Sequence, residues 1–270
     1  MLDQLYMEQY YEEVKDWQDP NPKPVIVEHN GIHVVRDDLM PGGTKARGAD
    51  YLIGHDPTNS HIEEWVYGSS PASGYAQVSI PYVTNRYGKK TVLFMAKRNM
   101  DNLHPFQKEG MRLGAEYHWV PNGMLGVTQK RAKDYVAESP ETRKLLPLGL
   151  DHAKVIACLV KVAKSLNIQP KEVWSVGSSG TLSRALQYAW PDAVVHVVHS
   201  GGHTMSDSEI GRAIYHETRY KFSQSVADEE MPPFPTVSNY DAKAWQPMID
   251  YHKEYGRCDP VLFWNVAGEL

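Results

Sequence analysis

From about residue 90 onward, hydrophobic and polar positions along the chain follow two alternating periods. Short, nearly continuous apolar runs such as KTVLFMA (90–96) and EVWSV (172–176) are typical of buried strands. Between such runs lie longer segments with apolar residues three and four positions apart, most clearly in DHAKVIACLVKVAKSLN (151–167). Strands that alternate with helices of this length need crossover connections, which predicts an α/β fold with mostly parallel, twisted sheets flanked by helices.

Both ends of the chain depart from this alternation. VIVEH and IHVVR flank an Asn-Gly pair within residues 25–36, which predicts a β-hairpin. DEEMPPFPTVSN (228–239) predicts a long loop, because its prolines and polar residues interrupt any regular period. The other elements expected in these regions are helices over residues 3–17, from about Thr44, over 73–87 and over 241–256, and a last strand over 259–265.

Three loops rich in glycine and small polar residues each follow a predicted strand. They are PGGTKAR (41–47), YGSSPASGYAQ (67–77) and GSSGT (177–181). Taken singly, they are also explained by a lysine in solvent, a turn with a serine cap and a strand-to-helix turn without a ligand. In an open α/β sheet, however, such loops converge on the crevice where ligands bind. A lysine beside an anion site suits a phosphate-bearing aldehyde held as a Schiff base.

The loop at residues 177–181 gives the clearest local signal. Gly177 and Gly180 permit close approach of the backbone, while Ser178, Ser179 and Thr181 offer hydroxyl groups at the start of a helix. Backbone N–H groups and a positive helix end favour an anion there, so this loop predicts a phosphate site. It is neither a Walker loop, since no Lys-Ser/Thr pair follows in register, nor a GxGxxG fingerprint.

The order and spacing of these segments resemble the tryptophan-synthase-β-like, fold-type-II enzymes that use pyridoxal 5′-phosphate. VVRDDLMPGGTKAR (34–47) is similar to Arg-Glu-Asp-Leu followed by Gly-Gly-Asn-Lys-x-Arg in the aminocyclopropane-carboxylate deaminase and D-cysteine desulfhydrase branch, with Asp37 for Glu and Thr44 for Asn. DPVLFWNVAG (259–268) is similar to that branch's Asp-Pro-Val-Tyr segment. The resemblance spans about residues 25–268.

This resemblance implies roles for individual residues. Lys45 would be the Schiff-base lysine and proton carrier, and residues 177–181 would hold the phosphate of pyridoxal 5′-phosphate. Tyr75 stands where the family has Asn beside the cofactor oxygen, so the ring contacts are expected to differ. No residue clearly matches the partner of the pyridine nitrogen, for which Asn265 is the closest polar choice. The substrate-binding residues that the resemblance implies are Ser70, Ser73, Gly74 and Gln77.

The resemblance also implies two lobes around a central cofactor cleft, and a homodimer. The expected parts are an N-terminal helical extension over residues 1–22, a larger cofactor-binding lobe over 23–67 and 150–270, and a smaller lobe over 68–149.

The implied activity is a lyase that deaminates, eliminates from or decarboxylates an amino acid or amino-acid-like substrate at its α-carbon. The chain is short for the group, so one alternative is a bacteriophage enzyme that acts on an amino acid attached to a modified nucleobase in DNA. Two further alternatives are a non-catalytic relative that binds a phosphorylated ligand and a nucleotide-binding transferase.

Bulk properties narrow the classes of partner. The formal net charge of −5 gives no general attraction to nucleic acid or anionic membranes. No apolar run approaches the roughly 20 residues of a spanning helix, and the N-terminus does not resemble a signal peptide. Cys158 and Cys258 belong to no paired motif, which favours a cytoplasmic location, or the host cytoplasm for a viral protein. The histidines of HSGGH (199–203) are separated by a glycine turn, so no metal site is predicted.

Overall fold

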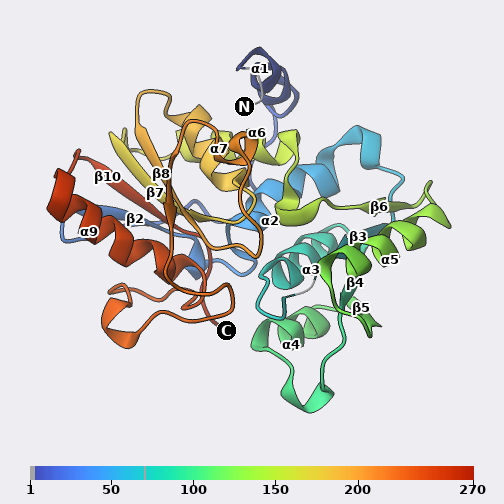
Figure 1. Cartoon of the computed structure of the whole chain (residues 1–270). Helices are drawn as coiled ribbons and strands as arrows, with labels where there is room; N and C mark the ends of the chain where they lie inside the picture. Colours follow the sequence, from blue (N-terminus) through green and yellow to red (C-terminus); the bar gives the residue numbers. More distant parts are fainter. Residues whose placement is uncertain (1–3, 70) are drawn as a thin grey trace. The chain divides into compact units, whose positions relative to one another are not determined.

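The computed structural model describes residues 4–69 and 71–270 (Figure 1). Within it the chain divides into two compact units. The first unit contains the residues up to Gly48 together with Asp151–Glu269, and the second contains Ala49–Leu150. Each unit is built around its own sheet.

The boundary between the two units differs from the predicted boundary at residue 67. Strand β3 (Glu64–Gly68) pairs in parallel with β4 (Lys90–Ala96) and with β6 (Arg143–Leu145). Because both pairings belong to the sheet of the second unit, residues 49–67 lie in that unit and not in the first.

The first unit contains a six-stranded sheet (Figure 1). In spatial order its strands are β1 (Ile26–His29), β2 (Ile32–Arg36), β10 (Val261–Asn265), β7 (Glu172–Gly177), β8 (Val194–His199) and β9 (Ile214–Glu217). β1 and β2 form the antiparallel hairpin that the Asn-Gly pair predicts, and every other neighbouring pair is parallel. The predicted α/β class with mostly parallel sheets is confirmed.

The second unit contains a four-stranded sheet in the order β5-β4-β3-β6, where β5 spans Glu116–Val120, and all of its pairs are parallel. Val66, Val92 and Phe94 point from its strands into one cluster, which also includes Ala132 of the helix α5 (Leu125–Ala137). This apolar cluster anchors the helix to the sheet, because each buried side chain contributes about 1.5–3 kcal/mol.

Most helices lie where the apolar periodicity predicts them. The remaining α-helices are α1 (Gln4–Glu13), α2 (Gly43–Asp50), α3 (Ala76–Arg86), α4 (Pro105–Arg112), α6 (Ala153–Lys164), α7 (Thr181–Ala189), α8 (Asp207–Ile210) and α9 (Trp245–Tyr255). The shorter helical segments are η1 (Asp37–Leu39), η2 (Tyr51–His55), η3 (Pro57–Asn59), η4 (Met100–Asn102), η5 (Leu148–Leu150), η6 (Asp228–Glu230) and η7 (Asp241–Ala244). Strand β9 and helix α8 were not predicted, because four residues are too few to show a period. Among the described residues, no helix combines the length and the apolar character that crossing a bilayer requires.

Helix α9 covers one face of the six-stranded sheet (Figure 1). Its residues Trp245 and Met248 are buried against Val34, Trp174 and Phe263, which project from β2, β7 and β10. These strand residues alternate along each strand with residues that face the opposite side, as the pleat requires. The helix is therefore fixed over the strands whose ends carry the predicted site.

A buried carboxylate adds a polar link between α9 and the sheet. Glu172, at the start of β7, accepts hydrogen bonds from Trp174 Nε1, from His252 Nε2 at 2.6 Å and from the backbone N–H of Cys258 at 3.0 Å. Burial opposes ionisation, but these hydrogen bonds outweigh it and lower the pKa of Glu172. The carboxylate thus ties the helix and the segment before β10 to β7.

We expect Glu172→Gln to destabilise the fold by about 1–3 kcal/mol at pH 7, because a neutral amide cannot accept all three hydrogen bonds. The lowered pKa of Glu172 contributes stability above about pH 4, the range of an unfolded glutamate, and this contribution is lost as the pH falls through the lower folded value. Denaturant titrations at several pH values should therefore show the gap between wild type and variant closing in acid. Glu28→Gln, on the exposed edge strand β1, is the control; an equal loss in that variant would contradict the interpretation.

Candidate functional site

The carboxyl ends of four adjacent strands of the first unit lie at one edge of the sheet, because β2, β10, β7 and β8 are parallel neighbours. The segment that carries Lys45 follows β2, and the loop at Gly177–Gly180 follows β7. One strand, β10, lies between them, so the two loops begin roughly 10 Å apart. The structure thus brings the predicted lysine and the predicted phosphate loop to the same sheet edge.

Two glycines shape the turn that leads into α2 and Lys45. Gly42 has a φ of 92° and Gly43 a φ of 60°, a backbone region that residues with a Cβ rarely adopt. The next residue, Thr44, donates its backbone N–H to the carbonyl oxygen of Val266 at 2.9 Å. The turn therefore places Lys45 in the first turn of a helix that is fastened to the end of β10.

A buried ion pair between Asp37 and Arg47 fixes helix α2. Asp37 accepts hydrogen bonds from Thr44 Oγ1 at 2.7 Å and from Arg47 Nε and Nη2 at 2.9 and 2.8 Å. Trp264 Nε1 donates to Asp37 and to Thr44 Oγ1, and Arg47 also pairs with Asp19 at 2.5 Å. Asp37 and Arg47 thus anchor the segment that carries Lys45. The family resemblance did not imply this role.

Lys45 itself is half-buried, and two residues from the start of η7 lie close to it. Its Nζ atom lies 5.8 Å from the centre of the Tyr240 ring. Burial lowers the pKa of Lys45, and the negative charge of the Asp241 carboxylate opposes this shift. The net effect is downward, which favours the neutral amine that a nucleophilic lysine needs.

The loop between β7 and α7 is shaped by a glycine. Any other residue at its position would force the neighbouring backbone to move. Gly180 has a φ of 66°, and a Cβ built there would lie 1.9 Å from the backbone carbonyl oxygen of Glu209. Ser178 and Ser179 are half-buried, and the hydroxyl groups of Ser179 and Thr181 lie 2.9 Å apart. The first N–H groups of a helix have no acceptor within the helix, so this loop can receive an anion.

Arg184, a residue that sequence reasoning missed, braces this loop. Its guanidinium group donates to Asp151 at 2.6 Å and to the backbone carbonyl oxygens of Ser179 and Gly180 at 3.2 and 3.3 Å. The side chain is buried. The available signal was an arginine between the apolar residues Leu182 and Ala185–Leu186, because a buried guanidinium needs acceptors.

Asn265 is held by the protein's own groups. Its amide nitrogen donates to Asp38 Oδ1 and to the carbonyl oxygen of Pro235, both at 2.8 Å, and its amide oxygen accepts from Thr236 Oγ1. Both amide hydrogens are used, so Asn265 would have to break a buried bond before it could donate to a ring nitrogen.

The predicted substrate-binding residues belong to the second unit, in the loop between β3 and α3. Ser70 lies outside the described residues. Ser73, Gly74 and Tyr75 are half-buried, and the Tyr75 ring packs edge-on against Phe106. Gln77 is buried, and its amide nitrogen donates to the carbonyl oxygens of Ala72 and Gly74, both at 2.9 Å. Gln77 therefore braces the loop from within.

The two histidines of HSGGH lie at and beyond the end of β8. The Nε2 atom of His199 is buried and has no hydrogen-bond partner among the described residues. His203 is exposed and lies 3.5 Å from Glu209. Within the described part of the chain, no group of three or more His, Cys, Asp or Glu side chains could hold a metal ion.

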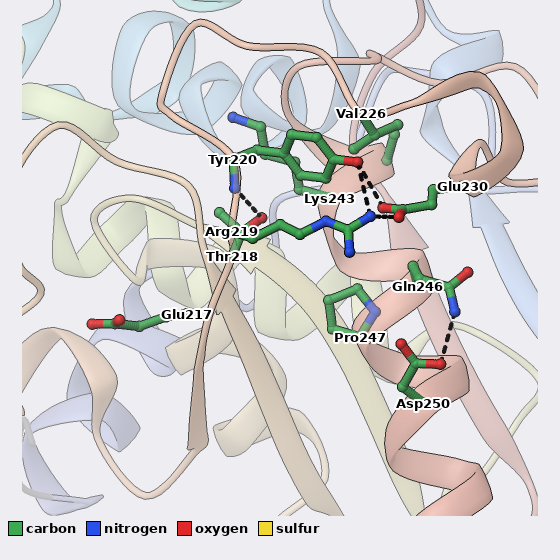
Figure 2. Close-up of a pocket in the computed structure, with 11 residues that line it drawn as sticks. Glu217, Thr218, Arg219, Tyr220, Val226, Glu230, Lys243, Gln246, Pro247 and Asp250 are labelled. Carbon is green, nitrogen blue, oxygen red and sulfur yellow. Dashed lines mark hydrogen bonds and ion pairs between the residues drawn. The ribbon is translucent and has the colours of Figure 1, made fainter.

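A pocket in the first unit contains a second buried lysine (Figure 2). Lys243 Nζ donates to the carbonyl oxygens of Lys221 and Phe222 at 2.9 and 2.8 Å, and burial lowers the pKa of Lys243 to about 8. Arg219 and Glu230, which also line the pocket, form an ion pair with each other. Because its amine is bonded to carbonyl groups, Lys243 fastens a loop rather than facing a ligand.

We expect Arg47→Met to cost about 3–5 kcal/mol of unfolding free energy, because Asp37 would remain buried without its cation. Urea denaturation followed by fluorescence measures the change. Arg131→Met, at an exposed position of α5, should change stability by no more than about 0.5 kcal/mol. Similar losses in the two variants would show that Arg47 does not anchor the segment.

We expect Gly180→Ala to destabilise the fold by at least about 2 kcal/mol, since a Cβ there meets both the positive φ and the Glu209 backbone. The matched control is Gly126→Ala in α5, where a Cβ meets no atom within 4 Å and the helix should gain up to about 1 kcal/mol. Thermal unfolding of both variants gives the comparison. A Gly180→Ala protein as stable as wild type would refute the described packing.

Neither a protein-family model nor a curated protein matches this sequence. Solved structures match over nearly the whole chain. An ACC deaminase homologue has a TM-score of 0.80 at 13% identity and covers 96% of this chain and 94% of its own. Threonine deaminase isoform 2 from Solanum lycopersicum has a TM-score of 0.72 at 12% identity, with 99% and 86% covered. A pyridoxal 5′-phosphate-dependent aspartate racemase has a TM-score of 0.68 at 11% identity, with 98% and 94% covered.

At these identities the likeness establishes the fold and carries over no activity. The fold that the sequence resemblance implies, that of the tryptophan-synthase-β-like, fold-type-II enzymes, is thereby confirmed.

Proposed function

We propose that this protein is a pyridoxal 5′-phosphate-dependent lyase that acts on an amino acid or amino-acid-like substrate and bonds its cofactor through Lys45. One observation carries the proposal: a half-buried lysine with a lowered pKa stands at the same sheet edge as a glycine-shaped loop at a helix N-terminus. The aspartate racemase that shares this fold is described as dependent on the same cofactor, which supports the proposal.

The residues of the first unit fit this cofactor. Lys45 offers the amine, and the loop between β7 and α7 offers backbone N–H groups with the hydroxyl groups of Ser178 and Ser179 for the phosphate. Gly180, which has no side chain, lets the backbone of Glu209 pack directly against that loop and hold its shape. When bound, pyridoxal phosphate supplies an electron-poor ring that stabilises negative charge at the substrate's α-carbon.

The protein's own groups would prepare and complete this chemistry. Burial lowers the pKa of Lys45, so its amine is available as a nucleophile and can later carry a proton at Nζ. Arg184 keeps the Ser179 and Gly180 carbonyl groups turned toward itself, which fixes the direction of the loop. Asp37 and Arg47 prevent α2 from shifting, so the amine stays in one place.

The proposed substrate is an amino acid or amino-acid-like molecule, and the proposed assembly is a homodimer. The proposed reaction is deamination, elimination or decarboxylation at the α-carbon, all of which begin with the same amine exchange. A binding protein without catalysis is the weaker candidate, because it has no need of a lysine held with a lowered pKa. An amino acid attached to a modified nucleobase falls within the same substrate class, so it belongs in the same test.

We expect purified protein to take up pyridoxal phosphate and to show an absorbance band that borohydride fixes irreversibly. Peptide mass spectrometry should then locate the reduced adduct on Lys45. Lys45→Gln should lose the band and at least about 10³-fold in turnover, since no other group can replace the nucleophile. The exposed Lys130→Gln is the control and should keep both.

The rival result is equally specific. An adduct on Lys243, a buried lysine whose pKa is also lowered, or a Lys45→Gln protein that still turns over substrate, would falsify the proposal. Once the adduct is assigned, a spectral screen against amino acids, amino-acid-bearing nucleosides and modified DNA identifies the substrate by the shift of the band.

A further inference from the structure

Three consecutive backbone N–H groups in the loop after β7 have no acceptor among the described residues. They belong to Ser178, Ser179 and Gly180. Successive free N–H groups in a turn form a concave site for an anion, but only while their peptide planes keep one orientation. The contacts that hold these planes therefore decide whether the loop can bind an anion.

The first of these peptide planes, between Gly177 and Ser178, is held by the residue that follows β8. Ser200 donates its backbone N–H to the carbonyl oxygen of Gly177 at 2.8 Å. A peptide unit is planar and trans, so its carbonyl group and its N–H group point in opposite directions. The bond to Ser200 therefore turns the Ser178 N–H away from β8 and leaves it without an acceptor in the described chain.

A buried lysine fixes Ser200 in turn. The side chain of Ser200 is buried, and its Oγ atom accepts a hydrogen bond from Lys243 Nζ at 3.2 Å. The same amine donates to the carbonyl oxygens of Lys221 and Phe222 at 2.9 and 2.8 Å. Lys243 belongs to η7, whereas its acceptors lie after β8 and in the long segment after β9. One amine therefore joins three segments of the chain.

The three bonds match the donors of one ammonium group. A protonated lysine carries three N–H donors, whereas the neutral amine carries two. All three acceptors are uncharged oxygen atoms, and among the described residues Lys243 forms no ion pair. Loss of one proton must therefore break one of the three bonds. The bond to Ser200 is the longest, so we expect it to be the one that is lost.

We propose that Lys243 is a positioning residue of the anion site: through Ser200 it holds the first peptide of the loop after β7 in the orientation that presents the Ser178 N–H to a bound anion. The ammonium group has to stay protonated for this role, because the neutral amine cannot keep all three acceptors. The inference rests on the proposed function for the identity of the anion, which would be the phosphate group of the cofactor. The positioning itself is a property of the protein without cofactor.

The protonation of Lys243 changes within a pH range that binding experiments can reach, because burial lowers its pKa to about 8. The titratable or charged side chains on the elements around it are Asp241 of η7, Asp250 of α9, His199 of β8, Glu217 of β9, and Arg219, Tyr220, Lys221 and Glu230 after β9. The Lys243 amine bonds to none of these described side chains. The affinity for an anion should therefore be full below about pH 8, where Lys243 is protonated, and should fall above it.

The test measures sulfate binding by calorimetry between about pH 6.5 and about pH 9.5, a range in which sulfate keeps its charge. The parent protein is the full chain with Lys45→Gln, which removes the other amine whose pKa burial lowers. Its sulfate affinity should fall about three- to tenfold as the pH rises through about 8. Ser200→Ala in this parent keeps the backbone bond to Gly177 but cannot accept the lysine, so it should bind weakly at every pH. Ser223→Ala, at an exposed position after β9, is the matched control and should behave like the parent.

A parent protein that binds no sulfate, or binds it equally well on both sides of pH 8, would overturn the inference without any further variant. The same conclusion follows if Ser200→Ala keeps the affinity and the pH dependence of the parent. If Ser200→Ala does not fold, Lys243→Met replaces it and should bind weakly at every pH. Ser178→Asp locates the anion, since a carboxylate in the loop should abolish binding there. Unchanged binding by this variant would mean an adventitious ion only, which also overturns the inference.

These outcomes are separable from those of the proposed function. A protein that takes up no pyridoxal phosphate, but whose sulfate affinity depends on pH and on Ser200, refutes only the proposed function. A protein that bonds the cofactor through Lys45, but whose sulfate affinity depends on neither, refutes only the positioning role of Lys243.

Discussion

The buried ion pair between Asp37 and Arg47 is the interaction on which the position of Lys45 depends. It joins the end of β2 to α2, and through Trp264 it also joins β10. Asp19 pairs with another nitrogen of the same guanidinium group. Segments far apart in the sequence therefore meet at Arg47. Because each member would be left as an uncompensated buried charge without the others, the cluster is retained or lost as a whole.

Burial around this cluster also determines the chemistry that the sheet edge can support. Asp37 and Asp38 each form an ion pair with an arginine, and these contacts hold both carboxyl groups in place. Asp241 and Lys45 have no ion-pair partner among the described residues, and burial raises the pKa of Asp241 and lowers that of Lys45. The same part of the molecule therefore contains paired charges next to two groups that burial pushes toward their neutral forms.

Much of the fold could be predicted from sequence, because apolar runs and helical periodicity are local signals. The hairpin around Asn-Gly and the helix over residues 153–164 are examples. The residues that fix the site could not be predicted in the same way. Arg184 and Gln77 point inward to backbone carbonyl groups that only the folded chain brings near them. The resemblance offers Asn265 as the partner of the pyridine nitrogen, but its three hydrogen bonds depend on residues 29 or more positions away. The hydrogen-bond partners of a buried side chain can come from distant parts of the sequence, whereas the periodicity of a helix or strand is visible within a few residues.

The contact between Gly180 and the carbonyl group of Glu209 has a consequence for how this protein can diverge. A substitution changes side chains and leaves the backbone atoms in place. The backbone of the short helix α8 therefore limits which residues fit in the turn before α7. A descendant that acquires a side chain at position 180 must first displace residues 207–210. Natural variation at these two places should therefore occur jointly, as a shift of main chain followed by a change of residue.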